Sequence, residues 1–194
     1  MKAVHCLPEG YREIFSIDLQ KDKKMAIKVN LLALLIAACL AVPMHFLVPI
    51  STLYRVRGGL GSYSIRVAVL FASMFLYIVL HELVHGAAMK LCGTKKVRYG
   101  FTGLYAFAAS DDFYGKKAYV FIALAPIVLW GVVFAVINPL VPVEWFWVVY
   151  ALQIVNLSGA AGDLLVTVKF SRLPKDILVQ DYGVGMKVYS KSEG

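Results

Sequence analysis

The sequence His81-Glu-Leu-Val-His85 directly follows residues 71–80, a stretch that contains no charged side chain. Ionisable groups at membrane depth cost about 2.5 to 3.5 kcal/mol each when charged, so three of them beside an apolar stretch indicate a functional site. On a helix of about 3.6 residues per turn, His81 and His85 project from one face and can reach the same metal ion. Glu82 then lies beside that ion. The motif therefore predicts two zinc ligands and a general base.

The composition places this motif in a membrane. The chain has 194 residues, of which 60% are hydrophobic and only 16% are charged, which is too apolar for an ordinary soluble domain. We expect an all-α integral membrane protein with four transmembrane helices, near residues 26–50, 65–91, 118–140 and 143–168. Each stretch is near or above the roughly 20 residues that cross a bilayer. The length fits a single membrane-embedded domain over residues 1–194.

The basic residues predict the orientation in the membrane. The net charge is +8, but these residues border the apolar stretches and form no aromatic-rich patch, which argues against nucleic-acid binding. Of the 20 Lys and Arg residues, six precede or begin the first span, six lie from Lys90 to Lys117, and five follow the fourth from Lys169 onward. The other three are Arg55, Arg57 and Arg66. This distribution predicts a multi-pass cell-membrane protein with both termini in the cytoplasm.

Three connecting segments have weaker patterns. Residues 97–109 are rich in aromatic and small side chains, and Thr102-Gly103 is typical of a turn, so a short β-hairpin is expected between the second and third spans. Residues 11–19 are expected to form a short amphipathic strand or helix at the membrane surface. Residues 178–189 read as a polar tail interrupted by glycines.

A catalytic zinc generally has three protein ligands and one water, so a third ligand is needed. Asp163 lies six residues before the basic end of its span, about 9 Å along a helix. His85 lies five residues before the basic end of its own span, about 7.5 Å by the same rise. Both spans are predicted to run toward the cytoplasm, so the two depths match. Asp163 is the predicted third ligand, and Asp111 and Asp112 in the cytoplasmic loop are the alternatives.

Two further polar residues lie near these positions. Asn156 is seven residues before Asp163, on nearly the same helix face. Its amide has two possible roles: a catalytic one, in which it holds a peptide carbonyl or the developing oxyanion, or an interhelical hydrogen bond. Tyr77 either orients a metal ligand or packs as an ordinary aromatic side chain. Small residues at 86–88 and 159–162 would let the two helices approach closely.

With these residues, the chain resembles the bacterial membrane family described as putative zincin peptidases, over roughly residues 81–182. It is more distantly similar to the site-two intramembrane metalloproteases. Their pattern has H-E-x-x-H in one transmembrane helix and, in a later helix, an Asn followed about two turns on by the aspartate of an L-D-G sequence. His81, Glu82 and His85 match the first element, and Asn156 with Asp163 resembles the second.

This chain departs from the site-two pattern at two points. The aspartate stands in the order Gly162-Asp163-Leu164, and Gly159 occupies the place of the proline expected after the Asn. The resemblance implies a Zn2+-dependent metalloprotease that hydrolyses peptide bonds of a membrane protein or peptide, in or near the cytoplasmic side of the bilayer. It implies two sets of site residues: catalytic Glu82 and Asn156, and metal-binding His81, His85 and Asp163.

Two other functions are compatible with the same motif. In the first, the zinc site staples helices in a non-catalytic membrane scaffold, and an open coordination position would argue against it. In the second, the protein transports metal ions. The transporter is the weaker alternative because carboxylates and histidines do not occur at successive depths along the spans.

Overall fold

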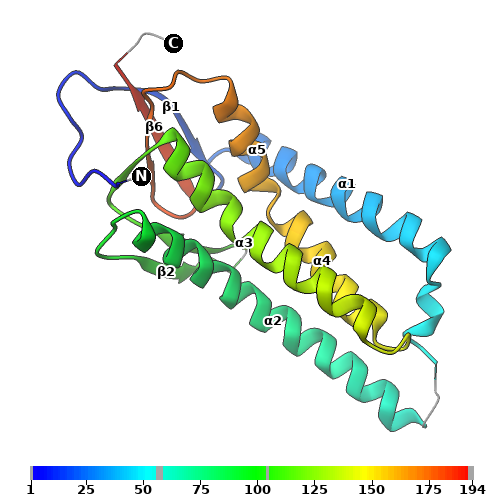
Figure 1. Cartoon of the computed structure of the whole chain (residues 1–194). Helices are drawn as coiled ribbons and strands as arrows, with labels where there is room; N and C mark the ends of the chain where they lie inside the picture. Colours follow the sequence, from blue (N-terminus) through cyan, green and yellow to red (C-terminus); the bar gives the residue numbers. More distant parts are fainter. Residues whose placement is uncertain (1, 56–58, 104, 192–194) are drawn as a thin grey trace. The chain divides into compact units, whose positions relative to one another are not determined.

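The computed structural model describes residues 2–55, 59–103 and 105–191 (Figure 1). Arg57, one of the basic residues that predict the orientation, lies outside them. The chain divides into two compact units. The first unit comprises Met1–Val29, Leu80–Pro126 and Gly162–Gly194, and the second comprises Asn30–Val79 and Ile127–Ala161.

In the part of the chain that the structure describes, three helices are long and apolar enough to cross a membrane: α1 (Lys23–Leu47), α2 (Leu60–Leu91) and α3 (Lys116–Ile137), which the 3-10 turn η2 (Asn138–Leu140) extends. The pair α4 (Phe146–Gly159) and α5 (Ala161–Ser171) forms a fourth candidate span. A short 3-10 turn, η1 (Ile50–Thr52), follows α1. These three to four helices suggest a membrane protein, as expected. Helices α1 and α3 start a few residues before the predicted spans, at lysines, which are good helix formers.

The fourth candidate span differs from the single helix predicted at 143–168, because it is interrupted at Ala160. The interruption falls in Gly159-Ala-Ala-Gly162, where each glycine disfavours the helix by about 1 kcal/mol relative to alanine. As a consequence, Asp163 lies in the first turn of α5. A carboxylate is favourable there because the N-terminal backbone N–H groups are not used within the helix.

Large apolar side chains are exposed along the long helices. Leu34 of α1, Phe75 of α2 and Val132 of α3 are 67%, 74% and 60% exposed, respectively. A soluble domain rarely exposes apolar surface so continuously, whereas lipid chains solvate it well. The burial pattern therefore agrees with helices that face a bilayer.

Within the described residues, six strands form two small antiparallel sheets, all in the first unit. One sheet has the order β1 (Arg12–Asp18), β6 (Gly185–Ser190), β5 (Leu178–Asp181) and β4 (Phe113–Gly115). The other is the hairpin of β2 (Arg98–Phe101) and β3 (Ala106–Ala109), which confirms the hairpin expected over residues 97–109.

The all-α prediction is therefore corrected to a mostly helical chain with small sheets. Residues 11–19 form a strand, and the expected C-terminal tail is a hairpin that turns at Gly183, where φ is +104°. Strand β1 pairs with β6 from the opposite end of the sequence. Such a pairing leaves no local pattern, because the partner that buries each strand is far away along the chain.

The core of the first unit joins this four-stranded sheet to three helices. Tyr114, Val179 and Val188 of the sheet are fully buried together with Phe170 of α5. The cluster is completed by residues of α2 and α3, among them Ala88, Met89, Ile122 and Ala123, and by Cys92, which directly follows α2. The three helical segments that carry the predicted metal ligands and their surroundings are thus held by one core.

Candidate metal centre

His81, Glu82 and His85 lie near the C-terminal end of α2, one turn before the small residues that pack into the core of the first unit. Both histidines are only 9% exposed, and their ring centroids are 4.8 Å apart. Two imidazoles that project from one helix face at positions i and i+4 are the arrangement that the sequence predicts for one shared metal.

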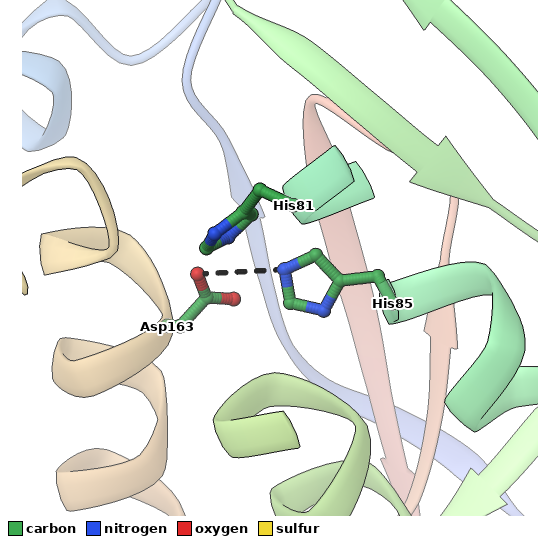
Figure 2. Close-up of side chains that lie close together, drawn as sticks. All are labelled: His81, His85 and Asp163. Atoms are coloured by element: carbon green, nitrogen blue, oxygen red, sulfur yellow. Dashed lines mark ion pairs between the residues drawn. The ribbon is translucent and has the colours of Figure 1, made fainter. Parts of the chain in front are cut away.

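Asp163 completes a group of three possible ligands. Figure 2 shows its carboxylate pointing toward the two imidazole rings, with His85 Nε2 at 3.8 Å from one carboxylate oxygen. One ligand atom from each of His81, His85 and Asp163 lies within 4.8 Å of the other two. Ligands at about 2.0 to 2.2 Å from a tetrahedral zinc lie about 3.5 Å apart, so the group fits this ion after small side-chain rotations.

The two alternative carboxylates are engaged elsewhere. Asp111 accepts hydrogen bonds from the Arg98 guanidinium, which lowers the pKa of this carboxyl group below its usual value. Asp112 lies 2.8 Å from Nδ1 of His5. Neither belongs to the ligand group found among the described residues.

A backbone carbonyl of α3 orients the second histidine. Nδ1 of His85 lies 2.9 Å from the carbonyl oxygen of Ile122, and a carbonyl can only accept, so Nδ1 carries the proton. The lone pair of Nε2 is then directed at Asp163 and available to a metal. The Ile122 carbonyl has no i+4 donor within α3, because Pro126, four residues on, has no N–H. This contact was not predicted, although the proline inside an apolar span is visible in the sequence.

The β2–β3 hairpin lies directly against the motif. The backbone N–H of Ala108 in β3 donates to the Glu82 carboxylate. A Cβ added to Gly86 would stand 2.0 Å from the Tyr99 hydroxyl oxygen, so β2 packs where only a glycine leaves room. Gly86 therefore allows the hairpin to approach the helix immediately after His85.

The edge of β3 away from β2 faces this site. Ala108 and Ser110 are two residues apart, so their N–H groups point to the same edge. The first donates to Glu82 and the second to the carbonyl oxygen of Asp181, at 3.0 Å. Glu82, the predicted general base, thus lies beside backbone groups at the edge of a strand.

Asp181 of β5 is a further buried carboxylate that the sequence analysis did not identify. Its oxygens accept hydrogen bonds from the Tyr119 hydroxyl at 2.6 Å and the Gly183 N–H at 2.8 Å. Burial raises the pKa of Asp181 to about 6, and the group also interacts electrostatically with His85 and Asp163. Asp181 lies in the segment that the sequence indicates as a polar tail, so nothing in its sequence neighbourhood predicts that this carboxylate is buried.

Asn156 belongs to the second unit and is fully buried. Its Oδ1 accepts a hydrogen bond from the Tyr77 hydroxyl at 2.8 Å, and its Nδ2 donates to the carbonyl oxygen of Ile127 at 3.1 Å. These bonds join α4 to α2 and α3, which is the interhelical role considered for it. Tyr77 is a hydrogen-bond donor here and more than an apolar packing residue. The catalytic role of Asn156 stays a prediction.

Comparison with known proteins agrees with the chemistry of this site. The chain is 32% identical over 119 residues to an uncharacterized 24.7 kDa protein in the gap 5'region of Pyrococcus woesei. The match covers 59% of this chain and 51% of the relative, so the chain spans about half the length of the curated protein that it matches. No solved structure matches. The model of a family described as "Putative zincin peptidase" matches residues 74–178, which include the histidine motif and Asp163. The chain belongs to this family of putative zincin peptidases.

Proposed function

We propose that this protein is a membrane-embedded zinc metalloprotease that hydrolyses peptide bonds in or near the cytoplasmic side of the membrane. The observation that best supports the proposal is the convergence of His81, His85 and Asp163 within 4.8 Å, with Glu82 in the same helical turn. The similarity to site-two intramembrane metalloproteases, which extends to Asn156 and Asp163, supports the intramembrane setting.

His81, His85 and Asp163 would hold the ion and leave one coordination position open. A zinc ion bound there would lower the pKa of a water molecule toward about 7 and polarise the scissile carbonyl. The Ile122 carbonyl accepts a hydrogen bond from Nδ1 of His85, which orients the ring so that Nε2 is the nitrogen that would coordinate the ion.

Glu82 is the proposed general base. Its carboxylate takes a proton from the attacking water and later delivers it to the leaving amine, which would otherwise depart as an unstable anion. The hydrogen bond from the Ala108 N–H fixes the orientation of the carboxylate. In this role Glu82 moves a proton and does not hold the metal.

The substrate would bind as an extended strand along the edge of β3 that carries Ala108. The Ala108 N–H on this edge already donates to Glu82, so a peptide that pairs with the remaining backbone groups of β3 would lie beside the base. A transmembrane helix must unwind locally to be cut, and strand addition would replace the hydrogen bonds that it loses. The expected substrate is a membrane protein or membrane-proximal peptide. Asn156, from its spacing to Asp163, is a candidate to hold the developing oxyanion.

The substitution Glu82→Gln tests the proposal because it preserves size and polarity but removes the base. The variant should bind one zinc per chain like the wild type, while cleavage of a single-span peptide in detergent falls by about 100-fold or more. Products are identified by mass spectrometry. The matched control is Glu9→Gln, at an exposed residue far along the sequence from the motif, which should cleave at the wild-type rate.

Equal turnover by the wild type and Glu82→Gln, on a peptide cut by the purified protein, would refute the hydrolytic role. X-ray absorption at the zinc edge tests the scaffold alternative independently of any substrate. Four protein ligands in a closed site would favour a non-catalytic zinc-binding scaffold, and three protein ligands with a light-atom water would favour the enzyme.

A further inference from the structure

The second unit contains a cavity of about 320 Å³ near the start of α2. Its lining residues come from the first turns of α2 and from the segment before α4: Ser62, Ile65, Arg66, Pro142, Glu144 and Trp145. The candidate metal ligands belong to the first unit, so this cavity is made by other residues. It carries opposite charges on its wall, from Arg66 and Glu144.

Arg66 is a buried cation that forms no ion pair with any of the residues the structure describes. Its side chain is nearly inaccessible, since the residue is only 3% exposed. The guanidinium donates to the carbonyl oxygens of Leu53 and Arg55 and to the Ser62 hydroxyl, all of which are neutral. A guanidinium has five N–H donors, so these bonds leave N–H groups for a ligand.

Among the described residues, no carboxylate lies within ion-pair distance of Arg66. A buried charge without a counter-ion is costly, and the cavity beside Arg66 is where an anionic group would relieve that cost. Phosphate and carboxylate suit a guanidinium best because they accept two parallel N–H bonds. Arg66 therefore favours a ligand that carries a phosphate or a carboxylate.

Glu144 excludes a simple anion as the occupant. This half-buried residue lines the same cavity and forms no ion pair within the part of the chain that the structure describes. An anion in the cavity would be attracted by Arg66 and repelled by Glu144. A ligand with an ammonium group at its other end satisfies both charges, and Trp145, which also lines the cavity, is of the residue type that best favours a cation.

We propose that this cavity binds a zwitterionic group, with its phosphate or carboxylate on Arg66 and its ammonium on Glu144. The phosphoethanolamine headgroup of a membrane lipid has this chemistry. Arg66 lies six residues into the candidate span α2, about 9 Å along its axis, and Trp145 directly precedes α4. These are depths at which lipid headgroups and interfacial tryptophans meet. A soluble amino acid or phosphoethanolamine offers the same pair of charges.

Lipid competition tests the proposal. The purified wild type, Glu144→Gln and the control Glu9→Gln are placed in nanodiscs with equal amounts of phosphatidylethanolamine and phosphatidylglycerol, and retained lipid is counted by native mass spectrometry. The wild type and the control should retain phosphatidylethanolamine at least about fivefold over phosphatidylglycerol. Glu144→Gln should lose this preference, because without its carboxylate the cavity attracts any phosphate.

Arg66→Gln should retain neither lipid, but this buried substitution can also unfold the protein, so the conclusion rests on Glu144→Gln. Equal retention of the two lipids by the wild type, or a preference that Glu144→Gln leaves intact, would overturn the proposal. Melting curves with millimolar glycine or soluble phosphoethanolamine distinguish the source. A rise in Tm that depends on Glu144 supports the site with a soluble ligand, and lipid retention without that rise supports a membrane headgroup.

Discussion

Nδ1 of His85 donates to the carbonyl oxygen of Ile122 at 2.9 Å, and that oxygen is the one that Pro126 leaves without a helical partner. A proline inside a helix normally weakens it. Here the unused carbonyl has a donor on a neighbouring helix, so the defect in α3 and the orientation of a candidate metal ligand in α2 depend on each other. This coupling explains why an apolar span carries a proline at this position.

We therefore predict that Pro126→Ala weakens zinc binding without removing a ligand. The new N–H at position 126 would compete with His85 for the Ile122 carbonyl, and the imidazole would lose part of its orientation. The zinc dissociation constant should rise by about tenfold, the lower end of the range for such supporting contacts. Competition with a fluorescent chelator measures it.

Pro43→Ala is the matched control, because Pro43 also lies inside a long apolar helix but belongs to the second unit. It should leave the zinc dissociation constant unchanged while also restoring a helical hydrogen bond. If both substitutions weaken zinc binding equally, the effect reports general helix mechanics and the proposed coupling is wrong.

The identity of the third metal ligand gives a second prediction. Asp163→Ala should lower zinc affinity by at least about 100-fold, since it removes one of three protein ligands and leaves His85 Nε2 without its carboxylate neighbour. Asp111→Ala and Asp112→Ala should retain full zinc occupancy, because these carboxylates are bound to Arg98 and His5. Metal analysis after gel filtration measures all three. If either loop variant loses zinc while Asp163→Ala retains it, the third ligand is in the loop and not at Asp163.

The sequence predicted what depends on local spacing. The i and i+4 histidines lie on one face of α2, and the depth argument placed Asp163 at their level; the structure brings these three together. The contacts that the sequence did not reveal are long-range. Ala108 reaches Glu82 only because the hairpin folds back on Gly86, and β1 finds its partner β6 at the other end of the chain. No periodicity within either segment encodes such a partner.

Substitutions at Asn156 and at its partner Tyr77 distinguish the interhelical role of Asn156 from its proposed catalytic role. Because Tyr77→Phe leaves Oδ1 of Asn156 without its donor, it should cost about 1 to 3 kcal/mol of stability. Asn156→Ala should cost a similar amount, and the double variant should be less destabilised than the sum, as residues sharing one hydrogen bond are. Denaturant unfolding in detergent measures these values.

Activity then decides whether Asn156 also serves the reaction. An oxyanion-binding amide would lower kcat by about 100-fold on removal, whereas loss of an interhelical bond would not. If Asn156→Ala and Tyr77→Phe give the same kcat on a cleaved peptide, Asn156 only joins helices. A large additional loss of kcat in Asn156→Ala alone would establish the catalytic role.

The orientation predicted from the basic residues is tested by labelling single cysteines in a variant that lacks Cys6, Cys39 and Cys92. Cysteines at positions 24, 96 and 187 should react only after the membrane is permeabilised, and a cysteine at position 57 should react in intact cells. The reason is the excess of Lys and Arg in the segments on one side of the spans. Labelling of position 96 in intact cells would show that the predicted orientation is wrong, and would contradict the proposed cytoplasmic access to the site.

Asp181 predicts a pH dependence of stability. Burial raises its pKa from 3.8 to about 6, so the folded state binds this proton more tightly than the unfolded state does. The resulting stabilisation is complete below the unfolded pKa and is lost as the pH rises through the folded value. Asp181→Asn does not titrate. The Tm of the wild type minus the Tm of this variant, measured with chelator present, should therefore fall between pH 3.8 and about 6. Above that pH the difference should stay constant.

Asp111 provides a control of opposite sign. Its pKa is lowered by the Arg98 guanidinium, so its contribution to stability is present above the unfolded pKa and is lost as the pH falls. The difference in Tm between wild type and Asp111→Asn should hence change in the opposite direction, and weakly, because this ion pair is exposed. If Asp181→Asn and Asp111→Asn gave parallel curves, the buried position of Asp181 would not be the cause of its titration.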